Sequence, residues 1–440
     1  MKQPLRLTAL GLQHVLAMYA GVVIVPLIVG KSVGMTGEQL TYLVSIDIFM
    51  CGVATLLQAL SGRFIGIGLP VMLGCTFTAV GPMISIGKEY GISSIYGSIL
   101  VSGLIIVIIS SIFGKLVRFF PPVVTGSVVT IIGITLIPVA INNMGGGEGS
   151  AAFGSAENMI LSFGTLIFII AVYRFSKGFL RAISILLGLG AGTVAAAMLG
   201  IIDFTPVTEA SVVHAIKPLY FGMPSFEWGP ILTMTLVAIV SLVESTGVYF
   251  ALGNICDKKL SERDLAKGYR AEGLATILGG FLNAFPYTAF SQNVGLIQLS
   301  GVKTKKVIYI AGFMLLFLGL VPKVGAVTTI IPAPVLGGAM VAMFGMVIAQ
   351  GIKMLSAVVF ESQENSMIIA CSVGMGLGVT VVPELFSKLP GALQILTSNG
   401  IVAGSFTAIA LNILFHMIPN RQSKVQEAEV RAADPAAAVK

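Results

Sequence analysis

Fourteen apolar stretches separated by short polar loops run through most of the 440-residue chain. Most of them reach the ~20 residues that a membrane-spanning helix needs. Only 10% of the residues are charged, whereas soluble proteins average about 25%. The pattern predicts an α-helical polytopic membrane protein with fourteen transmembrane segments. Their expected ranges are 8–30, 41–60, 69–86, 93–113, 121–141, 158–175, 182–200, 229–252, 271–285, 287–300, 306–321, 327–349, 366–382 and 400–418.

The lysines and arginines fall mainly in alternate loops. If the N-terminus is cytoplasmic, 21 of the 26 basic residues lie on the cytoplasmic side, as the positive-inside rule requires. The net charge of +7 therefore reflects the basic residues of the cytoplasmic loops, and we expect no nucleic-acid partner. Both termini are predicted to be cytoplasmic, and the first apolar stretch is too long for a signal peptide and is expected to be retained. The polar, alanine-rich tail 419–440 is predicted to be disordered.

The two halves of the sequence repeat weakly. Residues 122–133 and 334–345 share Pro, Val and Gly positions, and residues 68–76 resemble 284–292 at nearly the same offset. Seven predicted segments separate the copies, and an odd number inserts the second copy upside down. The sequence therefore predicts a 7+7 inverted repeat, in which substrate sites lie near the midplane between the copies.

The third and tenth segments, 69–86 and 287–300, are short and interrupted. Pro286 precedes a β-favouring run, and the polar triplet Ser291, Gln292 and Asn293 follows it. We expect an extended strand that leads into a half-helix in each segment. Irregular backbone at membrane depth survives only where it is buried or lines a cavity. The free N–H groups of the half-helix would then face a ligand.

Two polar side chains inside apolar segments are the main candidates for the site. A carboxylate at the depth of Glu244 costs roughly 2.5–3.5 kcal/mol, so it needs a partner, a proton or water. The alternative is a neutral Glu244 that hydrogen-bonds a neighbouring helix. The Gln292 amide offers a donor and an acceptor to a planar ligand. The presence of Asn293 could be explained by helix capping alone, because it lies at the start of the half-helix.

Three further residues are weaker candidates. Glu272 is predicted to open the ninth segment, where it would act in proton coupling, stabilise the helix start or pair with Arg270. His14 is the only histidine inside a predicted span, and it would take part in proton coupling, support the site or be structural. Phe77, at the third-segment break, would stack on a ring or pack in the core. The four cysteines form no CxxC pair, which predicts neither a zinc site nor a disulfide framework.

These residues resemble the nucleobase–ascorbate transporter family, also called nucleobase:cation symporter 2. The family signature Gln/Glu-Asn-x-Gly-x4-Thr is matched from Gln292 to Ser300, with serine in place of threonine. Gln13-His14 and Glu244-Ser245-Thr246-Gly247 also look like family motifs. The similarity spans about residues 8–418 and is strongest to bacterial uric acid and xanthine permeases.

The resemblance implies a core domain, 8–116 and 228–322, and a gate domain, 117–202 and 326–418. It implies that Glu244 and Gln292 bind the purine, with Phe77 and Ser291 in contact and Asn293 in support. Glu272 stands at a position that is usually occupied by aspartate in the family. Many relatives carry Asp or His where this chain has Val248, so a two-carboxylate relay within the eighth segment is not expected.

The sequence thus predicts a plasma-membrane secondary transporter for proton-coupled uptake of uric acid, xanthine or both, rather than an enzyme. The coupling ion is expected to be H⁺ rather than Na⁺, with no cofactor and no metal. A homodimer through the gate domain is left open by the resemblance. Two alternatives remain at this point. One is a symporter for uracil or another nucleobase, and the other is a transporter or channel for inorganic anions on the same 7+7 fold.

Overall fold

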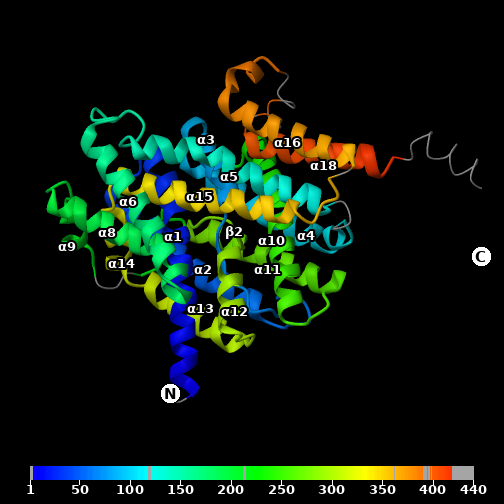
Figure 1. Ribbon diagram of the computed structural model, residues 1–440, viewed down its shortest axis with the longest axis horizontal. Helices are drawn as coiled ribbons and strands as arrows, with labels where there is room; N and C mark the ends of the chain where they lie inside the picture. The colour runs from blue at the N-terminus through cyan, green and yellow to red at the C-terminus, as the bar shows by residue number, and fades with distance from the viewer. Residues whose placement is uncertain are drawn as a thin grey trace, which may run out of the picture.

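The computed structural model describes residues 3–116, 120–211, 215–360, 362–389, 394, 397 and 399–418 (Figure 1). The predicted disordered tail 419–440 lies outside these residues. The described chain is mostly helical, with one two-stranded sheet near its centre. This architecture is a helical polytopic membrane fold.

The first half of the chain contains ten described elements up to residue 198, followed by the short helix α9. They are α1 (Gln3–Ser32), α2 (Gly37–Ala59), β1 (Leu73–Cys75), the 3₁₀ helix η1 (Phe77–Ala79), α3 (Val80–Glu89), α4 (Ile92–Leu116), α5 (Pro122–Met144), α6 (Ala156–Phe175), α7 (Gly178–Ala182), α8 (Ser184–Met198) and α9 (Thr205–Glu209).

The second half follows a similar order. Its elements are α10 (Trp228–Ile255), α11 (Glu262–Leu282), β2 (Tyr287–Ala289), α12 (Ser291–Ser300), α13 (Lys305–Gly319), α14 (Pro322–Thr329), α15 (Ala333–Leu355), α16 (Gln363–Val381), the 3₁₀ helix η3 (Pro383–Phe386) and α18 (Gly400–His416).

Eight helices within the described ranges are long and apolar enough to cross a membrane: α1, α2, α4, α5, α6, α10, α15 and α16. A ninth span results if α13 and α14, which are bent by 78° at a short break, are counted together. Helices α8 and α18 are apolar but shorter. The count of fourteen segments therefore stays a prediction.

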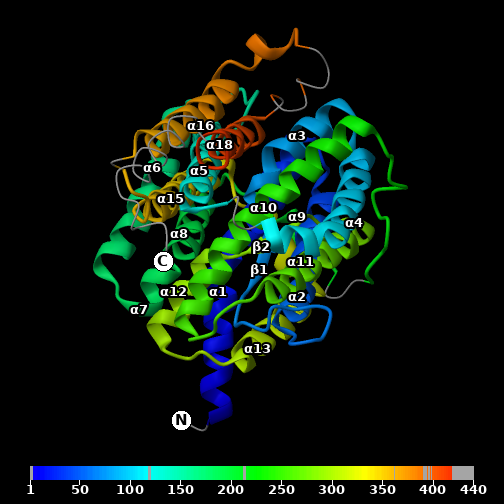
Figure 2. The same ribbon diagram turned by 90° about the vertical axis from the view of Figure 1, so that its right-hand side faces the viewer.

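The helices pack in two groups. In Figure 2, α5, α6, α15, α16 and α18 lie to the left of the sheet, and α2, α4 and α11 lie to its right. The α4–α11 group contains α1, α2, α4, α10, α11 and α13. The α5–α15 group contains α5, α6, α8, α15, α16 and α18. In the second group α5 and α15 run antiparallel in close contact. A Cβ on Gly133 would lie 2.5 Å from Cγ1 of Ile348, so only glycine lets these backbones approach.

Two predicted boundaries were wrong. The ninth segment was expected to begin at residue 271, but α11 begins at Glu262. Ser261 and Asp264 form a capping box there, which satisfies the first N–H groups of the helix. The twelfth segment was expected to begin at residue 327, but α15 begins at Ala333, with Pro332 as its N-cap. Proline lacks the N–H that a continuous helix needs, so it separates α14 from α15.

Strands β1 and β2 pair in antiparallel fashion, with Leu73 opposite Ala289 and Cys75 opposite Tyr287. Each has only three residues and is followed by a helix start. All six strand residues are buried. Between the two pairs lies Gly74, where a Cβ would come within 2.4 Å of the Phe290 ring. The sheet therefore brings two helix starts from the two halves of the chain together at the centre of the protein.

Candidate functional site

The start of α12 leaves backbone donors for another partner. Its N-cap residue is Phe290, which provides no side-chain cap for the helix. The first N–H groups of a helix have no partner within the helix. Here they belong to Ser291 and Gln292, which line the same small cavity as Phe290. Unpaired N–H groups and the positive end of the helix dipole make this point suitable for an electron-rich ligand.

The other helix start, at η1, is capped by the protein itself. The hydroxyl oxygen of Thr76 accepts a hydrogen bond from the Thr78 backbone N–H at 3.3 Å. The neighbouring Phe77 ring packs between Phe290 and Phe344, with ring centroids 6.0 and 5.8 Å away. Phe77 is therefore a wall of the cavity that is already held by other aromatic rings.

Glu244 lies in the middle of α10 and is partly buried. Its carboxylate accepts a 3.4 Å hydrogen bond from the Thr78 hydroxyl. None of the three salt bridges among the described residues includes it. Because the carboxylate has one long hydrogen bond and no cation beside it, a proton, water or a ligand must complete its surroundings.

One cavity of about 20 Å³ joins these groups. Four of the site residues that the sequence predicted line it: Phe77, Glu244, Ser291 and Gln292. The remaining lining residues are Val129, Thr288, Ala289, Phe290, Val347 and Gln350. That volume holds about one water molecule, so the described conformation is closed around the site. A second cavity of about 30 Å³ meets it at Phe290 and Gln292.

Sequence reasoning missed the contribution of α5 and α15 to this cavity. Val129 comes from α5, whereas Val347 and Gln350 come from α15. The two valines could not be recognised from the sequence, because valine is common in apolar helices. Gln350 could have been recognised, because it is a polar residue in the predominantly apolar helix α15.

Asn293 and His14 are together but do not line this cavity. The Asn293 side-chain nitrogen lies 3.1 Å from Nδ1 of His14 and donates to the His14 backbone carbonyl at 3.0 Å. Both side chains are buried. They join the start of α12 to α1, so their contacts are those of residues that hold the site in place.

Glu272 occupies different surroundings. It was expected at a helix start, but it lies ten residues into α11 and is 2% exposed. Arg270 does not pair with it and instead donates to Ser110, Ser111 and the Phe64 carbonyl. The correction follows from the earlier beginning of α11, which moves Glu272 from the helix end into the protein interior.

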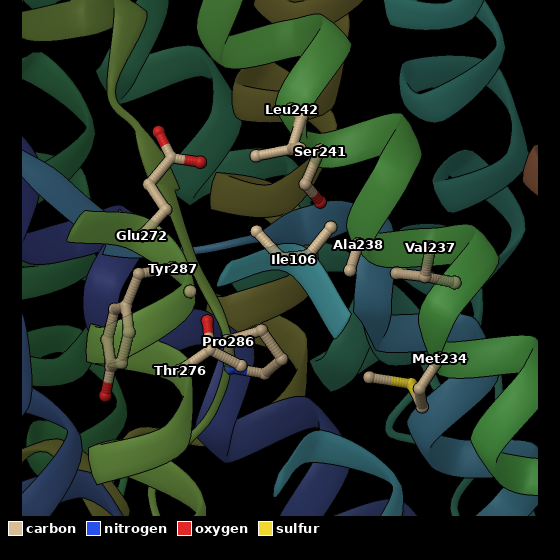
Figure 3. A pocket seen from close by; sticks show the side chains of 11 residues that line it. Ile106, Met234, Val237, Ala238, Ser241, Leu242, Glu272, Thr276, Pro286 and Tyr287 are labelled. Atoms are coloured by element: carbon tan, nitrogen blue, oxygen red, sulfur yellow. The ribbon is translucent and has the colours of Figure 1, made fainter. Parts of the chain in front are cut away.

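The Glu272 carboxylate is half satisfied. One oxygen accepts a hydrogen bond from the Tyr249 hydroxyl, and the other has no partner among the described residues. Glu272 also lines a separate cavity of about 20 Å³, opposite α10 side chains such as Ser241 (Figure 3). Thr276 and Tyr287 lie on the Glu272 side of this space. The cavity has room for about one water.

A series of threonine and serine groups lies between the two carboxylates. Thr78 contacts Glu244, and the Thr78 backbone N–H contacts the Thr76 hydroxyl. The Thr76 hydroxyl lies 3.1 Å from the Ser241 hydroxyl. Ser241 in turn lines the cavity of Glu272. Polar groups therefore follow one another from the first cavity to the second.

A buried group of possible metal ligands also came together, which the scattered cysteines did not predict. Ligand atoms of Asp47, Cys51 and Cys75 lie within 4.8 Å of one another. The Asp47 oxygens are already occupied, because they accept from the Phe285 N–H, the Tyr287 hydroxyl and the Cys75 thiol. We interpret Asp47 as an anchor for both strands rather than as a metal ligand.

Comparison with known proteins now places the fold and the family. The permease family model matches residues 5–385. The chain is 65% identical to a xanthine permease of Bacillus subtilis over 422 residues, which cover 96% of each protein. It is 63% identical to the uric acid permease PucK of the same organism over 411 residues, covering 93% of this chain and 96% of PucK.

The fold also resembles a solved structure of low sequence similarity. The transmembrane domain of the cyanobacterium bicarbonate transporter BicA superposes with a TM-score of 0.60 at 14% identity. The match covers 94% of this chain and 98% of that domain. The family match over most of the chain and the high identity to two permeases agree with the signature from Gln292 to Ser300. The chain belongs to the permease family of nucleobase–ascorbate transporters, and it is a multi-pass membrane transporter rather than an enzyme.

Proposed function

We propose that the protein takes oxidised purines, uric acid and/or xanthine, across the plasma membrane into the cell together with a proton. The observation that carries the proposal is the single cavity that joins Glu244, Gln292, Phe77 and the start of α12. Relatives named for xanthine and uric acid support the substrate class.

The chemistry of the cavity suits such rings, which are planar and rich in N–H donors and C=O acceptors. Gln292 would offer one donor and one acceptor to the purine edge, and Glu244 would accept or share a ring N–H. Phe77 would contact the ring, and the N–H groups at Ser291 would face a carbonyl or a negative charge. Asn293 would act through the position of α12 rather than by direct contact.

Proton coupling would use both buried carboxylates. Glu244 would carry the proton beside the substrate, and Glu272 would exchange protons with it through water molecules that enter between the hydroxyl groups of Thr78, Thr76 and Ser241, because the backbone N–H that joins Thr78 to Thr76 cannot relay a proton. His14 would stabilise the helix start that positions Gln292. An inward proton gains about 2.3 kcal/mol per 100 mV, which permits about 50-fold accumulation of a neutral purine such as xanthine. Neither a cofactor nor Na⁺ is part of this proposal.

We further propose that the chain crosses the membrane fourteen times as a 7+7 inverted repeat, with both termini in the cytoplasm. The paired strands β1 and β2, each followed by a helix start, support the two broken segments. The α4–α11 group would be the core domain, 8–116 and 228–322, and the α5–α15 group the gate domain, 117–202 and 326–418. Movement of one against the other would alternate access. We also propose that two copies of the chain form a homodimer through the gate domain.

Uptake of labelled xanthine by cells that overproduce the protein tests the function. Unlabelled urate should compete, whereas uracil and sulfate should not. Competition by uracil would favour a pyrimidine carrier, and competition by sulfate would favour an inorganic-anion transporter. Collapse of the proton gradient should stop accumulation without added sodium. Accumulation that persists and needs sodium would reject proton coupling.

A further inference from the structure

Gln350 is the one amide of the α5–α15 group among the lining residues of the candidate site. It lies on α15, near the C-terminal end of the helix, and is exposed. The cavity that it lines also contains Glu244 and Gln292 from the other helix group. Gln350 is the one exposed residue among the ten that line the cavity, so it lies on the side where the closed cavity would open.

The amide of Gln350 is available to a ligand. No hydrogen bond joins its side chain to any of the residues that the structure describes, and the same holds for the Gln292 side chain. Its neighbours in the cavity wall, Val129 and Val347, are apolar and offer it nothing. A glutamine amide has two N–H donors and a carbonyl acceptor, and all of these are unused in the described conformation.

We propose that Gln350 is a specificity-determining residue that hydrogen-bonds the purine edge left free by Glu244 and Gln292. The inference rests on the proposed purine transport. Uric acid and xanthine share their six-membered ring with its two carbonyl groups, so contacts to that ring do not separate them. They differ at the five-membered ring, where uric acid has a carbonyl and two N–H groups, and xanthine has a C–H, one N–H and a bare nitrogen.

Gln350 contacts that five-membered edge. Its N–H group donates to the carbonyl of uric acid, and its own carbonyl accepts from a ring N–H. Xanthine presents a C–H in place of the carbonyl and leaves one amide group unpaired. A site whose polar group loses its partner discriminates strongly between two ligands. Gln350 therefore favours uric acid over xanthine.

The position of Gln350 adds a second consequence. Glu244 and Gln292 belong to elements that pack with the α4–α11 group, whereas Gln350 belongs to the α5–α15 group. A purine held by all three joins the two groups. Its release on the exposed side then requires the Gln350 contact to break, while the other two contacts remain.

The test compares Gln350→Ala and Gln350→Met with the wild type. The methionine variant keeps the length of the side chain and removes the amide. Each purine is titrated as a competitor of labelled xanthine uptake, and its binding is followed by thermal shift of the purified protein. Gln363→Ala is the matched control, because Gln363 is an exposed glutamine of the same helix group that lies outside the cavity.

Both variants should lower the ratio of urate to xanthine affinity about 3- to 10-fold, because they remove two hydrogen bonds to uric acid and one to xanthine, a difference of one hydrogen bond. Gln350→Asn should recover part of the loss, and Gln363→Ala should change neither affinity. An unchanged ratio of urate to xanthine affinity in either active variant would overturn this inference alone. A wild-type protein that binds neither purine would overturn the proposed function and the inference with it.

Discussion

Glu244 and Glu272 lie on consecutive long helices, α10 and α11, but their surroundings differ in one decisive way. Glu244 is partly buried and shares its cavity with an unpaired amide and a helix start. Glu272 is 2% exposed and shares its cavity mainly with apolar side chains. The first arrangement presents several hydrogen-bonding groups to a ligand, whereas the second presents few, although both cavities measure about 20 Å³. The comparison teaches that depth alone does not define a binding residue.

The largest effect should come from Glu244→Ala. A hydrogen bond to a charged group contributes roughly 1.5–3 kcal/mol, so its loss should lower xanthine uptake and affinity about 10- to 100-fold. Uptake of labelled xanthine and a thermal-shift titration measure the two effects. Glu262→Ala, at the exposed first position of α11, is the control and should leave both unchanged. Wild-type affinity in Glu244→Ala would remove Glu244 from the site.

Glu272→Gln should separate binding from accumulation. The amide keeps the size of the side chain and an acceptor for Tyr249, so xanthine binding should stay within about two-fold of the wild type. Accumulation should fall from the about 50-fold that 100 mV permits to about one-fold, because Glu272 can no longer exchange a proton with Glu244. Equal losses of binding in the Glu272 and Glu244 variants would end the distinction between the two residues.

These two residues also show what sequence reasoning can reach. Glu244 and Gln292 were predicted because a polar side chain in an apolar segment is costly and therefore conspicuous. The structure brings them into one cavity, although their separate roles remain proposals. Glu272 was misplaced, because the polar first two turns of α11 look like a loop until the capping box of Ser261 is seen.

The sequence could not predict which residues of distant segments contact each other. His14 and Asn293 were each predicted, but nothing in either motif indicated that they contact each other. Asp47 was not selected, although it accepts hydrogen bonds from the segment of β2. Such pairs depend on how helices cross, and hydrophobic patterns report which face is apolar rather than what it meets.

Tyr249→Phe should weaken the Glu272 region and spare the Glu244 cavity. It removes the hydroxyl that donates to Glu272 and accepts from Gln58, leaving two buried groups without this partner. The expected cost is about 1–3 kcal/mol of unfolding free energy, with no change in the affinity for xanthine. Thermal unfolding of the purified protein measures the first effect. Tyr309→Phe, whose hydroxyl is partly buried and has one backbone acceptor, should cost less.

The smallest effect is expected for Ser241→Ala, which interrupts the polar series between the two cavities. Loss of its hydrogen bond with Thr76 should cost roughly 0.5–1.5 kcal/mol of stability. The rate of proton-coupled accumulation should fall, and xanthine affinity should not. The control is Thr235→Ala on the same helix, whose hydroxyl donates to the Ile231 carbonyl. Equal transport rates in the two variants would exclude Ser241 from the proton path.

The pairing of β1 with β2 has a consequence for how the protein is made. The Met72 carbonyl and the Thr76 N–H find their partners, the Phe290 N–H and the Pro286 carbonyl, only when the second half has been synthesised and has entered the bilayer. Until then the first strand keeps open N–H and C=O groups in a setting where each one costs several kcal/mol. The nascent first half must therefore be sheltered, by the insertion machinery or by its own helices, until the second half arrives. A ribosome stalled before β2 should leave a chain that is inserted yet sensitive to membrane proteases.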